Sequence, residues 1–159
     1  MPRTGLFVLL TLLTSILFFA QLTQAAVAID CVKFGNVLSI NNLEILKLKA
    51  TSDDGTAAGA YVKGTFLKAY ATADLGPHFQ MKIGPRSYDT LEVYYSDETK
   101  LPRIKKGDHV IVCGRYTTNK NGFLENPKSP DGAYLTQTGT AWSPYAEDGF
   151  IIIRGHLYQ

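Results

Sequence analysis

The chain has 159 residues, with 16 Lys and Arg against 14 Asp and Glu, and its formal net charge at pH 7 is +2. A charge this small argues against a protein that holds a polyanion over its whole surface, so any basic site must be local. About 130 residues remain once the amino-terminal segment is set aside, and that is the commonest size for a single domain.

The first 28 residues, MPRTGLFVLLTLLTSILFFAQLTQAAVA, have the layout of a secretory signal peptide. One basic residue, Arg3, precedes an apolar run over residues 6–20, and small residues follow. Cleavage after Ala25 or Ala28 fits the small-residue rule, and we favour Ala25, which makes residues 1–25 the signal peptide. The alternative is a permanent membrane anchor, but the apolar run is shorter than the ~20 residues that cross a bilayer. We therefore expect a periplasmic or secreted protein with no stable membrane anchor after cleavage.

The chain has two cysteines, Cys31 and Cys113. In an oxidising compartment such a pair is more often joined than free. A disulfide between them would close a loop of about 80 residues and stabilise the fold by ~4 kcal/mol in the chain-entropy model. Two buried thiols that act as small hydrophobic side chains are the alternative. Neither cysteine has a His or second Cys at metal-ligand spacing, so we expect no zinc site and no other cofactor.

The segment VLSINNLEILKLKATSDDGTAAG, residues 37–59, fits two structures. The apolar residues between 43 and 46 can form one helical turn, whereas the alternation over residues 45–50 suits a strand. We predict a mixed segment that ends in a loop over residues 51–59. Residues 26–60 are treated as an amino-terminal extension.

Beyond this extension the hydrophobic pattern has a period of two, which predicts β-strands. Three segments fit: AYVKGTFLKAYA, HFQMKIG and TLEVYYS, at residues 60–71, 78–84 and 90–96. Phe79, Met81 and Ile83 share one face of the second strand, as in a half-buried strand. The intervening TADLGP contains Asp, Gly and Pro, so the first two strands are predicted to form a hairpin.

The segment IKKGDHVIVCGRY, residues 104–116, fits a fourth strand entered through the turn KKGD. Val110, Val112 and Gly114 would share one face. Gly114 inside a strand pattern indicates a bulge or a sharp bend, which is how small barrels turn their corners.

Two further elements complete the pattern. AYLTQTGTAW, residues 133–142, supplies a fifth strand, and GFIIIRGHLYQ, residues 149–159, forms a terminal hairpin whose turn is Arg154 and Gly155.

The order YVKGTFLKAY, GPHFQMKIG, LEVYYSDE and LPRIKKGDHVIVCGRYTT resembles an OB-fold, a five-stranded barrel with a Gly near the middle of its first strand and a Gly-Asp turn before its fourth. The chain is more narrowly similar to small secreted bacterial OB-fold domains of uncharacterised function, which end in a DG segment, a strand and a hairpin. The tail here reads EDGFIIIRGHLYQ. Those domains carry a His-rich segment before the final DG, where this chain has TAWSPYAEDG, so the resemblance implies no histidine-dependent role.

The resemblance implies a mainly all-β fold, with one OB-fold-like domain over residues 26–159 and the barrel and terminal hairpin over residues 61–159. It also implies a ligand face, because OB-folds bind oligonucleotides or oligosaccharides across strands 2 and 3.

Four positive charges, Lys100, Arg103, Lys105 and Lys106, lie within seven residues. A solvated turn is the ordinary interpretation of such a cluster. The functional alternative is an anion contact beside tyrosines that stack on the ligand, although nine tyrosines also suit any β-sheet. The candidate ligand-binding residues are Tyr88, Tyr94, Tyr95, Lys100, Arg103, Lys105, Lys106 and Tyr116.

Signals of catalysis are few. YDTLEV, residues 88–93, resembles part of a secreted OB-fold nuclease site, in which carboxylates hold a divalent cation and arginines hold the phosphate. The matching constellation of Arg and Glu is missing downstream, where only Arg86, Arg103 and Arg115 are candidates. The three histidines are widely spaced, and none has a nearby Ser or Cys that fits a nucleophile.

Three functions follow, in order of preference. The first is a non-enzymatic binding module whose barrel face contacts a single-stranded oligonucleotide, a glycan or another anionic ligand. The second is a module that binds another envelope protein. The third is a metal-dependent, nuclease-like hydrolase.

Overall fold

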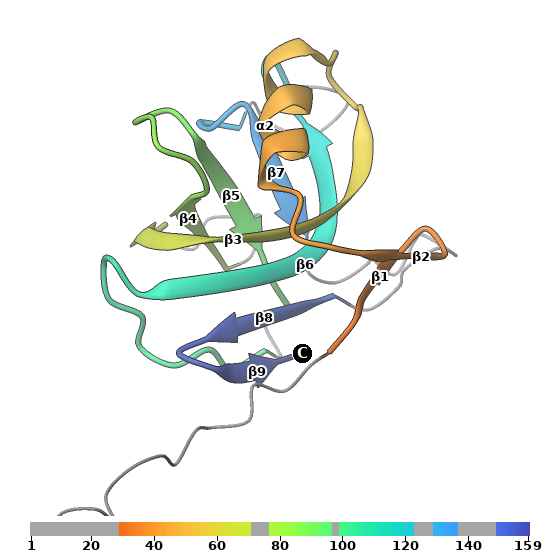
Figure 1. Cartoon of the computed structure of the whole chain (residues 1–159). Helices are drawn as coiled ribbons and strands as arrows, with labels where there is room; N and C mark the ends of the chain where they lie inside the picture. Colours follow the sequence, from red (N-terminus) through yellow and green to blue (C-terminus); the bar gives the residue numbers. More distant parts are fainter. Residues whose placement is uncertain (1–28, 71–76, 97–98, 123–128, 137–148) are drawn as a thin grey trace, which may run out of the picture.

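The computed structural model describes residues 29–70, 77–96, 99–122, 129–136 and 149–159 (Figure 1). Its elements in chain order are β1 (Cys31–Lys33), β2 (Asn36–Leu38), α2 (Asn42–Thr51), β3 (Ala57–Ala69), β4 (His78–Lys82), β5 (Thr90–Tyr94), β6 (His109–Thr118), β7 (Ala133–Thr136), β8 (Phe150–Ile153) and β9 (His156–Tyr158). The predicted signal peptide, residues 1–25, lies outside the described residues.

Five of the strands close into a barrel in the order β3, β4, β5, β7 and β6, with β6 pairing back onto β3. All neighbouring strands in the barrel are antiparallel except β5 and β7, which are parallel. Figure 1 shows the long strands β3 and β6 lying side by side across the front of the molecule. The predicted five-stranded, OB-fold-like barrel is therefore confirmed.

Strand β3 belongs to both sides of the barrel because it is long and curved. It pairs with β6 from Ala57 to Thr65 and with β4 from Thr65 to Ala69. The register with β4 shifts between Phe66 and Lys68, which marks a β-bulge. The barrel thus begins at Ala57, inside the segment predicted to be a loop, because the Ala and Gly residues there pair with β6.

Gly114 was expected to mark a bulge or a sharp bend, and of these two the bulge is absent, since Gly114 pairs with Ala60 in an unbroken register. Figure 1 shows β6 bending strongly along its length without such a shift. Gly114 instead marks the point at which β6 exchanges one neighbour for another: Cys113 pairs with β8, and Arg115 pairs with β7.

The barrel interior is filled by the apolar positions of the alternating strands. Phe79, Met81 and Ile83 are buried, as predicted for one face of their strand. The buried core consists of Ile45, Ala60, Val62, Phe66, Phe79, Met81, Ile83, Leu91, Val93, Val110, Val112, Tyr116, Ala133, Leu135, Ile151 and Ile153. The side chains at the alternate positions of these strands therefore point outward, onto the surface of the barrel.

Helix α2 resolves the ambiguous segment in favour of a helix. Leu, Lys and Glu are good helix formers, and Glu44 in the first turn and Lys49 in the last complement the helix dipole. Ile45 is its one buried residue, so tertiary packing rather than a broad apolar stripe holds the helix.

Two asparagines dock the start of α2 onto β3. The Asn41 side chain accepts a hydrogen bond from Tyr61 N–H at 2.9 Å and donates to the Gly59 carbonyl at 3.1 Å. Asn42 accepts from Lys63 N–H at 3.0 Å and donates to the Lys63 carbonyl at 2.7 Å. These contacts lie on the side of β3 opposite β6, over the stretch that β4 does not reach.

The predicted disulfide joins Cys31 to Cys113, with the two Cα atoms 5.6 Å apart. Both cysteines are fully buried and pack with Phe150 in a second apolar cluster. The β1–β2 hairpin, in orange in Figure 1, is thereby fixed beside the barrel.

The chain ends in the predicted hairpin, β8 and β9, whose turn residues Arg154 and Gly155 both have positive φ. Within the described ranges, none of the helical structure is long and apolar enough to cross a membrane.

Candidate anion-binding groove

A row of polar side chains crosses three strands on the outer surface of the barrel. Thr65 in β3 pairs with Lys82 in β4 on one side and with His109 in β6 on the other. The neighbours of these residues along the strands, among them Met81 and Val110, are buried in the core. Because side chains alternate along a strand, Thr65, Lys82 and His109 all point outward.

These residues line a groove of about 670 Å³. Its lining includes three basic side chains, Lys63, Lys82 and His109, and the described residues that line it include no carboxylate. Lys63 and His109 are exposed and Lys82 is half-buried. No described residue forms an ion pair with Lys63 or Lys82. The groove is therefore a concave surface whose two lysines are not paired with a carboxylate of any described residue.

The shape of the groove comes from the place where β3 and β4 separate. Gly64 lies so close to β4 that a Cβ there would clash with the Lys82 carbonyl group. Beyond Lys82 the two strands diverge, and the Asn42 amide bridges them by donating to the carbonyls of Lys63 at 2.7 Å and Ile83 at 2.6 Å. The floor of the groove is thus a fixed backbone surface, and its lysines project from a rigid base.

The basic turn predicted from the sequence continues this groove. Gly107 N–H donates to the Phe66 carbonyl, and Phe66 N–H donates to the Asp108 carbonyl, both at 2.9 Å. Because Phe66 follows Thr65 and Asp108 precedes His109, the turn is attached directly to two strands of the groove. Lys105 and Lys106 in this turn are exposed, and no described residue forms an ion pair with either.

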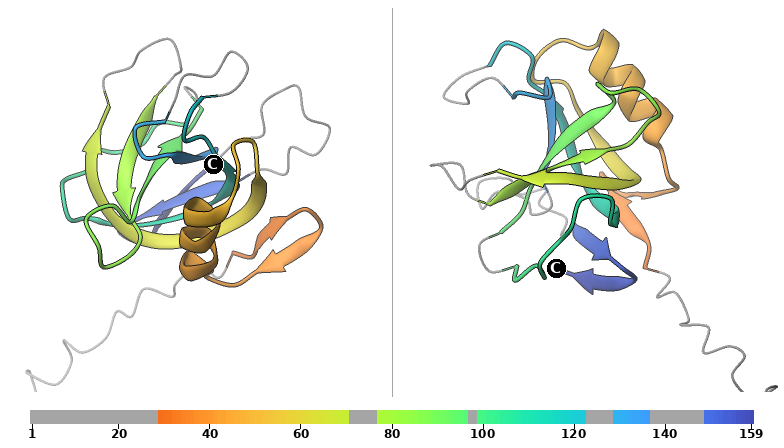
Figure 2. Two further views of the ribbon diagram at one scale, coloured as in Figure 1. Left: turned by 90° about the horizontal axis from the view of Figure 1, so that it is seen from above. Right: turned by 90° about the vertical axis from the view of Figure 1, so that its left-hand side faces the viewer.

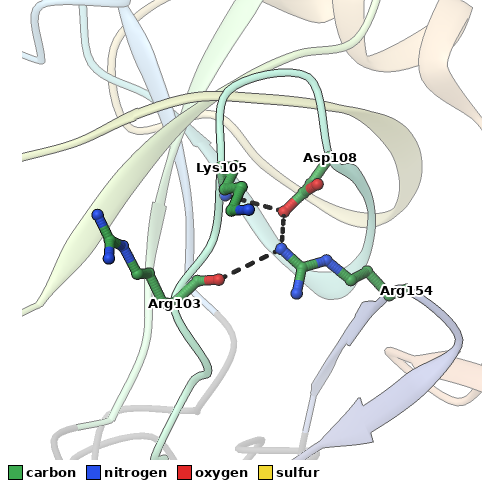
Figure 3. A network of polar contacts seen from close by, with 4 residues as sticks. All are labelled: Arg103, Lys105, Asp108 and Arg154. Carbon is green, nitrogen blue, oxygen red and sulfur yellow. Dashed lines mark hydrogen bonds and ion pairs between the residues drawn. The ribbon is translucent and has the colours of Figure 1, made fainter.

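Asp108 organises the turn, as Figure 3 shows. Its carboxylate accepts a hydrogen bond from Lys105 N–H at 2.8 Å and forms an ion pair with Arg154 at 2.5 Å. Arg154 also donates to the Arg103 carbonyl at 3.3 Å. The Lys105 N–H and then the Arg154 guanidinium hold the pKa of Asp108 below its ordinary value, so this carboxylate stays ionised. Among the described basic residues of this region, Arg154 is thus the one that forms an ion pair.

The other predicted ligand-binding residues do not gather at this groove. Lys100 and Arg103 are exposed in the segment between β5 and β6, whereas Tyr88 lies before β5. Tyr95 packs against the core, with its ring 6.1 Å from that of Phe79. Tyr116 is fully buried and its hydroxyl is bonded to Thr118, so that ring is not available to a ligand on the outer surface.

Tyr94 belongs to a different face, formed by the outward sides of β4, β5 and β7. Its ring stacks on His78 at 4.6 Å, and His78 stacks on Tyr70 at 4.7 Å. Tyr134 meets Tyr94 edge-on at 5.5 Å. These four rings contact one another, so they stabilise the fold in addition to forming this outer face.

Two buried carboxylates lie on this second face. Glu92 is 1% exposed and accepts a hydrogen bond from Ser129 at 2.6 Å. Asp131 accepts from Thr90 at 2.6 Å and Gln80 at 2.7 Å. Burial raises the pKa of Glu92, although the Ser129 hydrogen bond opposes the shift. This network ties residues 129–132 to the sheet and places two carboxyl groups there, and no lysine or arginine takes part in these hydrogen bonds.

No cluster of three or more His, Cys, Asp or Glu side chains that could hold a metal ion occurs in the part of the chain that the structure describes. Asp89, from the nuclease-like segment, is 6% exposed and accepts a hydrogen bond from Arg86 N–H at 2.9 Å. Its carboxylate therefore stabilises the turn before β5.

The sequence pattern alone does not single out Lys63 and Lys82 as ligand-binding residues. The period-two pattern places both on outward faces, and pairing the first two strands as a hairpin would have brought them to one side of the sheet. The strand register was the missing step.

In comparisons with known proteins, no protein-family model, no curated protein and no solved structure matches the chain.

Proposed function

We propose that the protein is a secreted or periplasmic, non-enzymatic module that binds an anionic polymer in the groove between β4, β3 and β6. The observation that carries the proposal is the row Lys82, Thr65 and His109, with Lys63 beside it, in a groove whose described lining has no carboxylate. The exposed Lys105 and Lys106 lie in the turn that is hydrogen-bonded to β3 and leads into β6, next to this groove.

The nearly neutral net charge of the chain supports a local anion-binding site. Removal of Arg3 with a signal peptide leaves 15 basic against 14 acidic residues, so attraction of a polyanion depends on where the charges lie. Lysines that form no ion pair with a described residue, on a rigid groove, concentrate positive charge in one place. The disulfide supports an oxidising compartment for the folded chain.

The lining residues favour recognition of charged groups over recognition of bases. No Tyr, Phe or Trp is present among the described residues of the groove, and sequence-tolerant binding of single strands usually uses such rings. We therefore expect phosphate, sulfate or carboxylate groups to be held by lysines, without a preference for nucleotide sequence. Binding rather than catalysis is proposed because the described lining places Thr65 beside His109 but includes no carboxylate that could orient this histidine as a base.

The test is fluorescence anisotropy of the chain from residue 26 onward with labelled single-stranded DNA, titrated between about 50 and 200 mM salt. If Lys63, Lys82, Lys105 and Lys106 each hold one phosphate, the logarithm of the binding constant should fall with the logarithm of salt at a slope of about −3. The double variant Lys63→Glu with Lys82→Glu should bind at least tenfold more weakly and lower that slope to about −1.4.

Lys47→Glu is the matched control, because Lys47 is an exposed lysine on α2 that does not line this groove. It should leave both affinity and slope nearly unchanged. Absence of binding at the lower salt concentration, or equal loss in the control and the double variant, would refute the site. Competition with heparin separates the ligand sources: stronger binding of heparin than DNA identifies a sulfated glycan as the better ligand.

A further inference from the structure

A second groove, of about 560 Å³, lies between α2 and the segment that joins β4 to β5. The left view of Figure 2 shows the helix and this light-green segment next to each other at one edge of the barrel. Leu43, Leu46 and Tyr88 supply apolar surface to its lining. Leu43 and Tyr88 are 83% and 62% exposed, so two large apolar side chains face solvent in the same groove. Such exposed apolar surface marks interaction sites.

The walls of this groove are held in place before any partner binds. The Lys49 ammonium donates to the carbonyls of Tyr88 at 2.8 Å and Thr90 at 2.6 Å, which ties the helix to the segment. Gly84 packs closely against Leu46: a Cβ added at Gly84 would lie 2.8 Å from a Leu46 methyl carbon, which is too close for a side chain to fit. A preorganised groove avoids the entropic cost of ordering its walls on binding.

An aromatic ring and a guanidinium stand together at the mouth of the groove. Arg86 donates to the Tyr88 hydroxyl at 3.0 Å, and its guanidinium carbon lies 5.6 Å from the centre of the Tyr88 ring. Tyr and Arg are, together with Trp, the residue types enriched at the energetic centres of protein interfaces. This pair is therefore suited to contact another protein.

The charge around the groove indicates the kind of partner. Among the described residues of the lining, Lys47, Lys49 and Arg86 are basic. Asp89 is the one carboxylate of this described set; it is 6% exposed and accepts a hydrogen bond from Arg86 N–H. No described residue forms an ion pair with Lys47 or Arg86. An apolar floor beside exposed cations complements a segment in which a bulky apolar side chain is flanked by carboxylates.

We propose that this groove binds an acidic peptide segment of another protein, with an apolar side chain between Leu43 and Tyr88 and carboxylates beside Lys47 and Arg86. The site is separate from the anion-binding groove, so it stands or fails independently of the function proposed above. Its ligand differs as well: it requires an apolar anchor in addition to negative charge.

The experiment is a titration of the ¹⁵N-labelled chain from residue 26 onward, followed by NMR, with the capped hexapeptide DELFDE and its charge-inverted counterpart KKLFKK. DELFDE should shift amide signals over residues 43–50 and 86–89, whereas KKLFKK should not. The double variant Lys47→Glu with Arg86→Glu should bind DELFDE at least tenfold more weakly and should gain binding to KKLFKK. Reversal of the preference cannot result from simple unfolding.

Lys106→Glu, in the other groove, is the matched control and should leave binding of DELFDE unchanged. Equal shifts with both peptides, or shifts scattered over the molecule, would overturn the proposal. Sodium laurate serves as a further probe. Shifts at the same amides with laurate but not with DELFDE would make this a site for fatty acids and would also overturn the proposal.

Discussion

Removal of the disulfide gives the largest change in stability that the structure allows us to calculate. Cys31 and Cys113 are 82 residues apart in sequence. In the chain-entropy model a cross-link over that separation lowers the entropy of the unfolded chain by an amount worth about 4.5 kcal/mol at 25 °C. The double variant Cys31→Ala with Cys113→Ala should therefore have a free energy of unfolding lower by about 4.5 kcal/mol. The loss of two buried sulfur atoms beside Phe150 adds to this.

The measurement is equilibrium unfolding in urea, followed by tyrosine and tryptophan fluorescence, of the oxidised protein and the double variant. The midpoint should fall, and the dependence on urea should steepen, because an unfolded chain without the cross-link exposes more surface. Reduction of the native protein should reproduce the behaviour of the variant. If the free energy of unfolding falls by less than about 1 kcal/mol and its dependence on urea does not change, the disulfide does not act by restricting the unfolded chain, and the reasoning is refuted.

Two further predictions concern the barrel itself. Burial raises the pKa of Glu92, so the folded chain holds that proton more tightly than the unfolded chain does. The resulting stability is present in full below the ordinary carboxyl pKa of about 4.3 and is lost as pH rises through the raised value. In the Glu92→Gln variant, the free energy of unfolding should decline less as pH rises through this raised pKa, as measured by urea titrations at a series of pH values. The same pH dependence in the variant and the native protein would contradict the prediction. Gly64→Ala should destabilise the fold by about 3 kcal/mol in the same assay, because the new methyl group meets the backbone carbonyl of Lys82, and a neutral effect would show that the strands separate freely.

The barrel was predictable because alternation is a local signal that survives in each strand. The same alternation accounts for Tyr116, which is an even number of residues from Val110 and Val112 and shares their buried face. The sequence also identified the paired cysteines, since the compartment and the count of two leave few choices.

The two grooves were not predictable, because they depend on contacts between distant segments. Lys63 and Lys82 become neighbours only through the register of β3 with β4. Glu92 has an outward position in its strand, yet Ser129 and the residues around it cover that carboxylate from a loop 37 residues away. Local patterns specify which side of a strand a residue occupies, but not which segment lies over it.

The asparagine pair at the start of α2 has a consequence for solubility. Where β3 has parted from β4, its backbone would otherwise present unpaired N–H and carbonyl groups, the template on which a foreign strand can add and from which aggregates grow. Asn41 and Asn42 occupy these groups at Gly59, Tyr61 and Lys63. At every second residue along this stretch, a backbone group is thus hydrogen-bonded to a side-chain amide, and a side-chain amide cannot extend the sheet. The junction between helix and barrel thereby protects an open edge against β-sheet self-association without a further strand.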